Sequence, residues 1–151
     1  MFKITRTNSS NPDFIGLVKR LDAFLAVTDG EEHAFYNQFN KIDKINHVVV
    51  FYENDSAYAC GAIKQVETSA TWEIKRMFVS DQMRGKGIGS LLLKELEFWA
   101  KELSVEKLIL ETGKRQVEAI ALYHKNGYKI TENFGQYIGV ENSICFEKLL
   151  K

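Results

Sequence analysis

The stretch Arg84-Gly85-Lys86-Gly87-Ile88-Gly89 alternates three glycines with other residues, directly before a helical pattern over Ser90–Leu103. Glycine adopts positive φ readily and lets a ligand or another backbone approach closely. At the start of a helix, such a loop points several free N–H groups at one spot, where the helix dipole also favours negative charge. Arg84 and Lys86 add two cationic side chains. The stretch therefore predicts a binding site for a phosphate or pyrophosphate.

The residues after this loop have the spacing of an amphipathic helix. The apolar positions recur at helical spacing and predict one buried stripe, formed by Ile88, Leu92, Leu96, Trp99 and Leu103. Lys94, Glu97 and Lys101 are expected on the opposite side, where Glu97 and Lys101 have the spacing of an ion pair. Before the loop, Trp72–Val79 is typical of a strand and Ser80–Met83 of a short turn.

Two common phosphate-binding motifs do not fit this loop. A P-loop needs four residues between its first glycine and a Gly-Lys-Ser/Thr end, which this stretch lacks. A dinucleotide fingerprint needs two residues between its second and third glycines, where this chain has only Ile88. The alternative is a glycine-rich turn that merely joins a strand to a helix. The basic residues and the amphipathic helix favour a binding site.

The segment Glu73–Leu93 closely resembles the central motif of the GCN5-related N-acetyltransferase (GNAT) family. That family binds the pyrophosphate of acetyl-coenzyme A with an Arg/Gln-x-x-Gly-x-Gly/Ala loop, which Arg84, Gly87 and Gly89 match. In the family, backbone groups at the end of the preceding strand pair with the pantetheine arm. The resemblance implies that acetyl-coenzyme A contacts Met77, Phe78, Val79, Arg84, Gly85, Lys86, Gly87, Ile88, Gly89 and Ser90.

A second stretch, Ala119–Tyr128, resembles the family's Ala-x-x-Leu-Tyr-x-x-x-Gly-Phe/Tyr motif. The family tyrosine lies beside the thioester sulfur, so the resemblance implies that Tyr123 gives the departing thiolate a hydrogen bond or a proton. Plain packing is the alternative for a tyrosine on an amphipathic helix. Family members often carry Asn three residues before the alanine. Here that position is Gln116, which can still hydrogen-bond coenzyme A with a different geometry.

Glu73 is the expected general base, since an alkyl amine with a pKa of ~10.4 must lose a proton before it attacks. Some family members use a glutamate at this position, often through water. Residues two apart on a strand share a face, so Glu73 is predicted to point with Lys75, Met77 and Val79. One alternative is a carboxylate that is solvated or salt-bridged beside Lys75. Glu111 is the rival base, but we interpret it as a residue that ends an apolar strand.

The length of 151 residues suits one domain with its own core, expected to cover residues 1–151. A formal net charge of zero argues against nucleic-acid or membrane-surface binding driven by bulk charge. Met1–Phe14 has no apolar segment typical of a signal peptide, so the cytoplasm is expected. Cys60 and Cys145 are expected as buried free thiols. The histidines show no metal-ligand spacing, so no metal is expected; they are His33, His47 and His124.

The order of the patterns predicts an α/β fold with a mixed, mostly antiparallel central sheet flanked by helices, as in the GNAT family. Strands are predicted at 2–6, 47–53, 57–66, 72–79, 107–111, 128–131 and 143–149. Helices are predicted at about 14–25, 31–40, 90–103 and 117–124. The long segment Glu132–Asn142, with Phe134 and Tyr137, is expected to shape the acceptor pocket.

These expectations combine into one function, transfer of the acetyl group of acetyl-coenzyme A to a primary amine by direct attack in a ternary complex. The acceptor is expected to be a small molecule or a peptide, and no residue pattern identifies it. Two alternatives stay open. One is a non-catalytic acyl-coenzyme A sensor or interaction module on the same fold. The other is an enzyme that transfers a different acyl group. Many relatives form dimers, so the resemblance is compatible with a homodimer.

Overall fold

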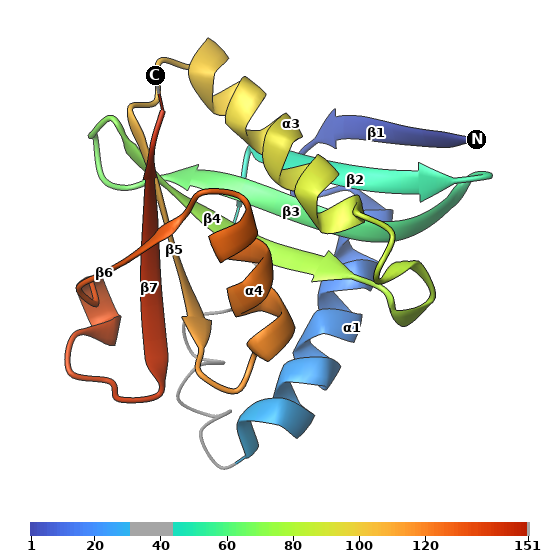
Figure 1. Cartoon of the computed structure of the whole chain (residues 1–151). Helices are drawn as coiled ribbons and strands as arrows, with labels where there is room; N and C mark the ends of the chain where they lie inside the picture. Colours follow the sequence, from blue (N-terminus) through green and yellow to red (C-terminus); the bar gives the residue numbers. More distant parts are fainter. Residues whose placement is uncertain (31–43, 151) are drawn as a thin grey trace.

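The computed structural model describes residues 1–30 and 44–150 of the chain. Its centre is a seven-stranded sheet in the order β1-β2-β3-β4-β5-β7-β6 (Figure 1). The strands are β1 (Phe2–Thr7), β2 (His47–Glu53), β3 (Ser56–Gln65), β4 (Thr71–Val79), β5 (Lys107–Gly113), β6 (Lys129–Thr131) and β7 (Ser143–Leu149). Among the strands of the described residues, only β4 and β5 pair in parallel. This confirms the predicted mixed, mostly antiparallel sheet.

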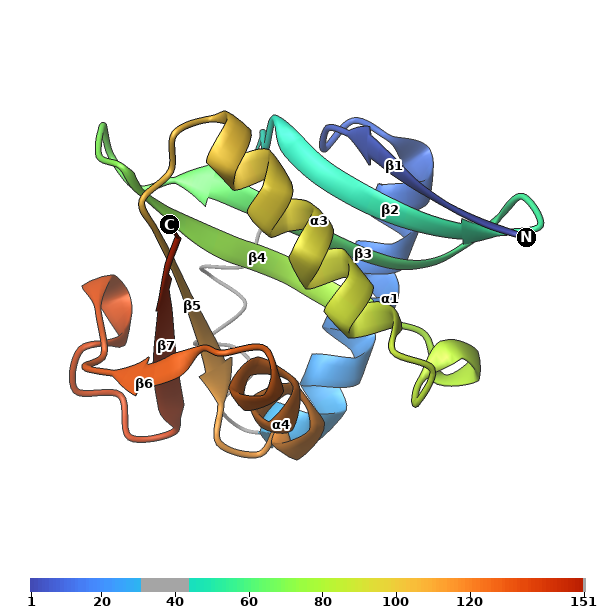
Figure 2. The same ribbon diagram turned by 45° about the horizontal axis from the view of Figure 1, so that its top comes forward.

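Three α-helices of the described residues cover the sheet: α1 (Pro12–Asp29), α3 (Ile88–Glu102) and α4 (Val117–Lys125). Helix α1 lies on one face, while α3 and α4 lie on the opposite face (Figures 1 and 2). The side chain of Asn11 caps α1 by accepting hydrogen bonds from the first backbone N–H groups. Two short 3-10 helices follow β4 and β6, namely η2 (Asp81–Met83) and η3 (Gly135–Tyr137). The helix predicted at 31–40 lies outside the described residues.

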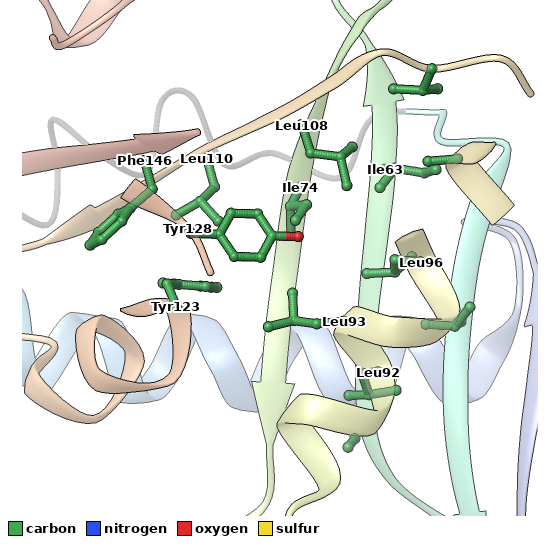
Figure 3. Packing of buried hydrophobic residues seen from close by; sticks show 14 of the residues in the cluster. Ile63, Ile74, Leu92, Leu93, Leu96, Leu108, Leu110, Tyr123, Tyr128 and Phe146 are labelled. Carbon is green, nitrogen blue, oxygen red and sulfur yellow. The ribbon is translucent and has the colours of Figure 1, made fainter. Parts of the chain in front are cut away.

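Alternating strand residues build one core on each face of the sheet. Val48 and Val50 of β2 face α1, whereas Val49 and Phe51 face α3. The α3 face carries the larger core, in which residues of α3, α4, β5 and β7 meet (Figure 3). Its labelled residues are Ile63, Ile74, Leu92, Leu93, Leu96, Leu108, Leu110, Tyr123, Tyr128 and Phe146. The alternation is the period of two that the sequence shows.

The buried stripe of α3 differs at two points from the prediction. Leu103, which was expected in the core, is 38% exposed. Ala100 is buried in its place. Glu97 was expected in solvent beside Lys101, but its carboxylate accepts a hydrogen bond from Tyr128 Oη at 2.7 Å and from Lys148 Nζ at 3.0 Å. The prediction was wrong because β7 and the chain after α4 cover this side of α3, which helical periodicity alone does not reveal.

A β-bulge in β4 reverses which face its side chains occupy. Arg76 has a φ of 61°, and the register with β3 shifts between Cys60 and Ala62. Ile74 packs in the α3 core before the bulge, and Met77 packs against the same core after it. Met77 and Val79 therefore lie on the opposite face from Glu73. The prediction that Glu73 points with Met77 and Val79 was wrong.

Strands β4 and β5 diverge soon after they meet. They pair only over three positions, ending with Glu73 opposite Ile109, and Figure 1 shows their ends pointing apart. Strand β5 continues to Gly113, so Glu111 lies inside the strand rather than at its end, contrary to our interpretation.

Across the two ranges that the structure describes, no helix has the length and apolar character needed to cross a membrane.

Candidate active site

A cleft of about 580 Å³ occupies the gap between the diverging strands. On the α1 face its wall includes Leu21, Phe24 and Glu73, and on the α4 face it includes Gln116 and Tyr123. Because residues from both faces line one cleft, the opening passes through the plane of the sheet. Two ligands can therefore meet in it from opposite faces.

The structure brings nearly all the predicted site residues to this cleft. Those that line it are Glu73, Met77, Phe78, Val79, Arg84, Gly85, Gly87, Ile88, Gly89, Ser90, Gln116 and Tyr123. Lys86 is the exception, since its exposed side chain lies outside the cleft wall. The two motifs that lie far apart in the sequence thus contribute to one site.

The glycine loop leaves the start of α3 open. Gly85 and Gly87 have φ values of 76° and 80°, which side chains other than glycine rarely adopt. Gly87 forms the N-cap of α3, and no side chain caps the first turn. The free N–H groups of this turn and the helix dipole favour an anion. This geometry fits the pyrophosphate that the sequence predicted.

Glycine at position 89 is explained differently from glycine at positions 85 and 87. A Cβ atom at Gly89 would lie 2.9 Å from Cδ2 of Leu122 on α4, which is closer than real Cβ contacts. At Gly85 and Gly87 a Cβ would meet nothing within 4 Å. Gly89 therefore permits close packing of α3 against α4.

The Arg84 side chain is used to hold the loop in place. Its Nε donates a hydrogen bond to the Val79 carbonyl at 3.0 Å, and its Nη1 lies 3.3 Å from Asp81 Oδ1. The guanidinium also lies 4.9 Å from the ring centre of Phe24 on α1. Arg84 thus ties the loop to the end of β4 and to α1, while its charge remains near the uncapped helix start.

Gln116 presents a buried donor to the cleft. Its side chain is only 9% exposed, and its Nε2 makes no hydrogen bond within the described parts of the chain. A buried amide without a partner costs free energy, so such groups are rare in folded proteins. A ligand carbonyl or phosphate oxygen in the cleft would satisfy this donor. The residues present therefore fit coenzyme A.

Tyr123 is buried between aromatic rings of the core. Its ring centre lies 5.7 Å from that of Phe146 and 6.0 Å from that of Tyr128. Burial raises the pKa of the Tyr123 phenol, and the nearby Glu111 carboxylate raises it further. The phenol is therefore neutral at physiological pH and available as a hydrogen-bond donor.

Glu73 lies on the α1 face of the sheet, directly opposite Lys64 in the register with β3. Burial raises the pKa of its carboxyl group, while Lys75 and Lys64 lower it in part. A carboxylate with a raised pKa holds a proton better at neutral pH than an ordinary glutamate does. This is the direction that a general base requires.

Glu111 was underestimated from the sequence, whereas Tyr137 was expected to help shape the acceptor pocket. Glu111 accepts a hydrogen bond from Ser143 Oγ at 2.7 Å, and it lines the same cleft as Glu73. Tyr137 is 3% exposed and lines the same end. The signal for Glu111 was a charged residue that interrupts the apolar run of β5. For Tyr137 it was the length of the segment after β6 and its two glycines.

Neither cysteine nor histidine forms a further site in the described ranges. Cys60 and Cys145 are buried and unpaired, which confirms the prediction of free thiols. Burial raises the pKa of Cys60 to about 12 and that of Cys145 to about 11. Between residues 1–30 and 44–150, no group of three acidic, His or Cys side chains could hold a metal ion.

Comparison with known proteins assigns the family. The model of the acetyltransferase (GNAT) family matches residues 15–128. The chain is 31% identical over 148 residues to an IAA acetyltransferase from Azospirillum brasilense, covering 97% of both chains. The chain therefore belongs to the GNAT family of N-acetyltransferases, and its sheet is the acyl-coenzyme A N-acyltransferase fold.

Solved structures agree with this assignment. A Klebsiella pneumoniae protein assigned as an acyl-CoA N-acyltransferase superimposes with a TM-score of 0.83 at 30% identity, covering 100% of this chain and 99% of that one. An N-acetyltransferase from Thermoplasma acidophilum in complex with coenzyme A has a TM-score of 0.72 at 16% identity, covering 99% of both chains. The second likeness shows the fold alone.

Proposed function

We propose that residues 1–151 form one N-acetyltransferase domain, which transfers the acetyl group of acetyl-coenzyme A to a primary amine by direct attack in a ternary complex. The observation that carries this proposal is the cleft itself. Its α3 and α4 side offers an uncapped helix start and the buried Gln116 donor, and its α1 side offers Glu73. The Thermoplasma acidophilum structure with coenzyme A supports the choice of donor.

Each face of the sheet would bind one of the two substrates. The glycine loop, Gln116 and Tyr123 would hold the coenzyme on the α3 and α4 side. The amine would enter from the α1 side, where Glu73 lies. Acetyl-coenzyme A supplies an activated thioester, and backbone N–H groups near Met77–Val79 would polarise its carbonyl.

The two side chains assigned to proton handling act at different atoms. Glu73 takes one proton from the ammonium form of the acceptor, directly or through water, so that the nitrogen lone pair can form the new C–N bond. The second proton leaves the nitrogen as the amide forms and neutralises the departing thiolate, through solvent. Tyr123 donates a hydrogen bond to the sulfur as the C–S bond breaks. Full proton transfer from Tyr123 would leave a buried phenolate, which the same burial that raises its pKa disfavours. We therefore assign Tyr123 hydrogen-bond donation.

The test combines a binding and a turnover measurement. Acetyl-coenzyme A should raise the melting temperature of the protein, and at least one member of a panel of primary amines should release free thiol from it. Binding without thiol release from any amine would instead support an acyl-coenzyme A sensor. Profiling acyl donors of increasing chain length tests the alternative of a different acyl group.

The remaining proposals concern the acceptor, the cellular location and the oligomeric state. We propose a small-molecule or peptide amine as acceptor, a cytoplasmic location and a homodimer as the assembly to test first. The Azospirillum brasilense relative is named an IAA acetyltransferase, so IAA belongs in the acceptor panel. Sedimentation of the purified chain tests the dimer.

A further inference from the structure

Two carboxylates from different strands lie on the same face at the point where the sheet opens. Glu73 pairs with Ile109 in the parallel register of β4 and β5, and paired residues point to the same side. Glu111 is two residues beyond Ile109 on the same strand, so it shares that face. The core packing agrees, because Leu108 and Leu110 face α3 instead. Both carboxylates also line the cleft.

A phenol is held near these carboxylates by a loop with several internal hydrogen bonds. Asn133 Nδ2 donates to the carbonyls of Tyr137, Val140 and Ser143 at 3.0, 3.1 and 3.3 Å. Tyr137 N also donates to the Phe134 carbonyl at 2.9 Å, and the two rings pack edge to face at 6.0 Å. A single amide thus closes the turn that places the buried Tyr137 side chain at the cleft.

Strands β4 and β5 each contribute a carboxylate near Tyr137. Glu111 and Glu73 each raise the pKa of Tyr137, after the larger effect of burial, and each raises the pKa of Cys145. The two carboxylates therefore act on one small region on the α1 side of the sheet. Lys75 and Lys64 partly offset the charge of Glu73. Glu111 is oriented by the Ser143 hydroxyl at 2.7 Å.

We propose that Glu73, Glu111 and Tyr137 form a subsite that binds the acceptor amine as its ammonium ion, with Glu111 as the fixed counter-charge. This inference rests on the proposed function and assigns Glu111 and Tyr137 as the residues that position its acceptor amine. An ammonium group forms strong charge-assisted hydrogen bonds to carboxylates and is attracted to the face of an aromatic ring. Glu111 then holds the nitrogen while Glu73 removes the proton.

The test measures binding without chemistry. Protein saturated with free coenzyme A is titrated by ligand-observed NMR at pH 7 with n-butylamine, which is protonated, and with n-butanol, which has similar size and no charge. Butylamine should bind at least ~10-fold more tightly, as expected from one charged hydrogen bond. Equal binding of the two probes would overturn the proposal.

Three variants of the subsite and one control variant locate the effect. Glu111→Gln keeps the shape and should weaken butylamine binding ~10-fold or more, with butanol unchanged. Tyr137→Leu should weaken it further than Tyr137→Phe, which keeps the ring. Glu141→Gln is the matched control, because Glu141 lies on the same loop but is exposed and outside the cleft. An unchanged affinity in Glu111→Gln, with its coenzyme A melting shift intact, would refute the subsite.

The same experiment separates this inference from the proposed function. If no amine releases thiol but butylamine still binds in a Glu111-dependent manner, the acetyltransferase proposal fails and the ammonium subsite stands. If amines are acetylated but butylamine and butanol bind alike, the subsite fails and the acetyltransferase proposal stands.

Discussion

At the scale of single residues, burial has opposite consequences for Glu73 and Tyr123. It raises the pKa of both groups. A raised pKa makes the Glu73 carboxylate a stronger base. A raised pKa keeps the Tyr123 phenol neutral, so it donates a hydrogen bond rather than its proton. The same physical effect thus suits the two residues to different ends of one reaction.

Glu73→Gln should lower kcat/KM by ~10²–10⁴-fold, the usual range for a general base. Because the wild-type base must be ionised, its rate should rise as the pH increases through the raised pKa of Glu73. The variant lacks this step, and high pH should restore much of its rate by deprotonating the amine in solution. A pH–rate profile from 5 to 10 measures this, and a near-native rate at pH 7 would assign the base elsewhere.

Tyr123→Phe removes only the hydroxyl and should lower kcat without a rescue at high pH, since its deficit lies at the sulfur. An acyl donor with a more acidic thiol should recover the lost rate. Steady-state kinetics with two thioesters of different thiol pKa makes the comparison. Equal losses with both donors would reduce Tyr123 to a packing residue.

At the scale of elements, the loop and helix α3 depend on glycine for two separate reasons. Gly87 is required by its backbone conformation, with a φ of 80°. At Gly89 a Cβ atom would lie 2.9 Å from Cδ2 of Leu122, so a side chain there would push against α4. Because α4 carries both Leu122 and Tyr123, the packing at Gly89 also helps to set the position of the phenol.

A double-mutant cycle can distinguish the two reasons. Gly89→Val should destabilise the protein through its clash with α4, and Leu122→Ala should relieve part of that loss, with a coupling of ~0.5–3 kcal/mol. Gly87→Ala should cost ~1–2 kcal/mol through its left-handed backbone, with no relief from Leu122→Ala. Urea unfolding gives each free energy, and additive losses at Gly89 and Leu122 would contradict the packing role.

The far end of the sheet carries a histidine between two tryptophans. The His47 ring lies 5.0 Å from Trp72 and 4.9 Å from Trp99. In the folded protein, burial lowers the pKa of His47 below 6.5. At pH values between this lowered pKa and 6.5, the unfolded chain therefore binds more protons than the folded protein. The His47 contribution to stability should therefore be complete above pH 6.5 and be lost as the pH falls below it.

Urea unfolding of the wild type and of His47→Gln between pH 5 and 7.5 isolates this effect. The raised pKa of Glu73 acts in the opposite direction in both proteins, so only their difference reports on His47. The wild type should lose more stability than the variant on acidification. Parallel pH curves would show that His47 does not contribute in this way.

At the scale of the whole molecule, the cleft lies between two parts of a sheet that are joined by only a short strand pairing. Strands β4 and β5 pair over only three positions. A ligand that binds across the cleft contacts both parts, so it should stabilise the native state as a unit. Acetyl-coenzyme A at 100 times its Kd should add ~2.7 kcal/mol to the free energy of unfolding.

Calorimetry at several concentrations of acetyl-coenzyme A tests this expectation, because the melting temperature should keep rising with ligand concentration. Acetate and free adenine serve as controls that lack the pyrophosphate. A melting temperature that does not respond to acetyl-coenzyme A would contradict the assigned cleft.

The sequence by itself determined the elements and the family motifs. Strand β2 and helix α3 follow from local periodicity, since hydrophobic burial selects every second residue on a strand and every third or fourth on a helix. The loop of Gly85 and Gly87 was also readable, because only glycine readily adopts its positive φ values. Such features depend on residues that are neighbours in the chain.

Only the tertiary structure decided how the site is arranged. The bulge at Arg76, a non-glycine residue with positive φ, turns Glu73 away from Met77, and no turn residue marks it in the sequence. The buried Arg76 guanidinium lies 3.6 Å from Asp22 of α1, so the bulge is held by a contact distant in the chain. Glu111 likewise reaches the cleft only because β4 and β5 diverge. Such positions depend on packing between elements, which one-dimensional patterns do not encode.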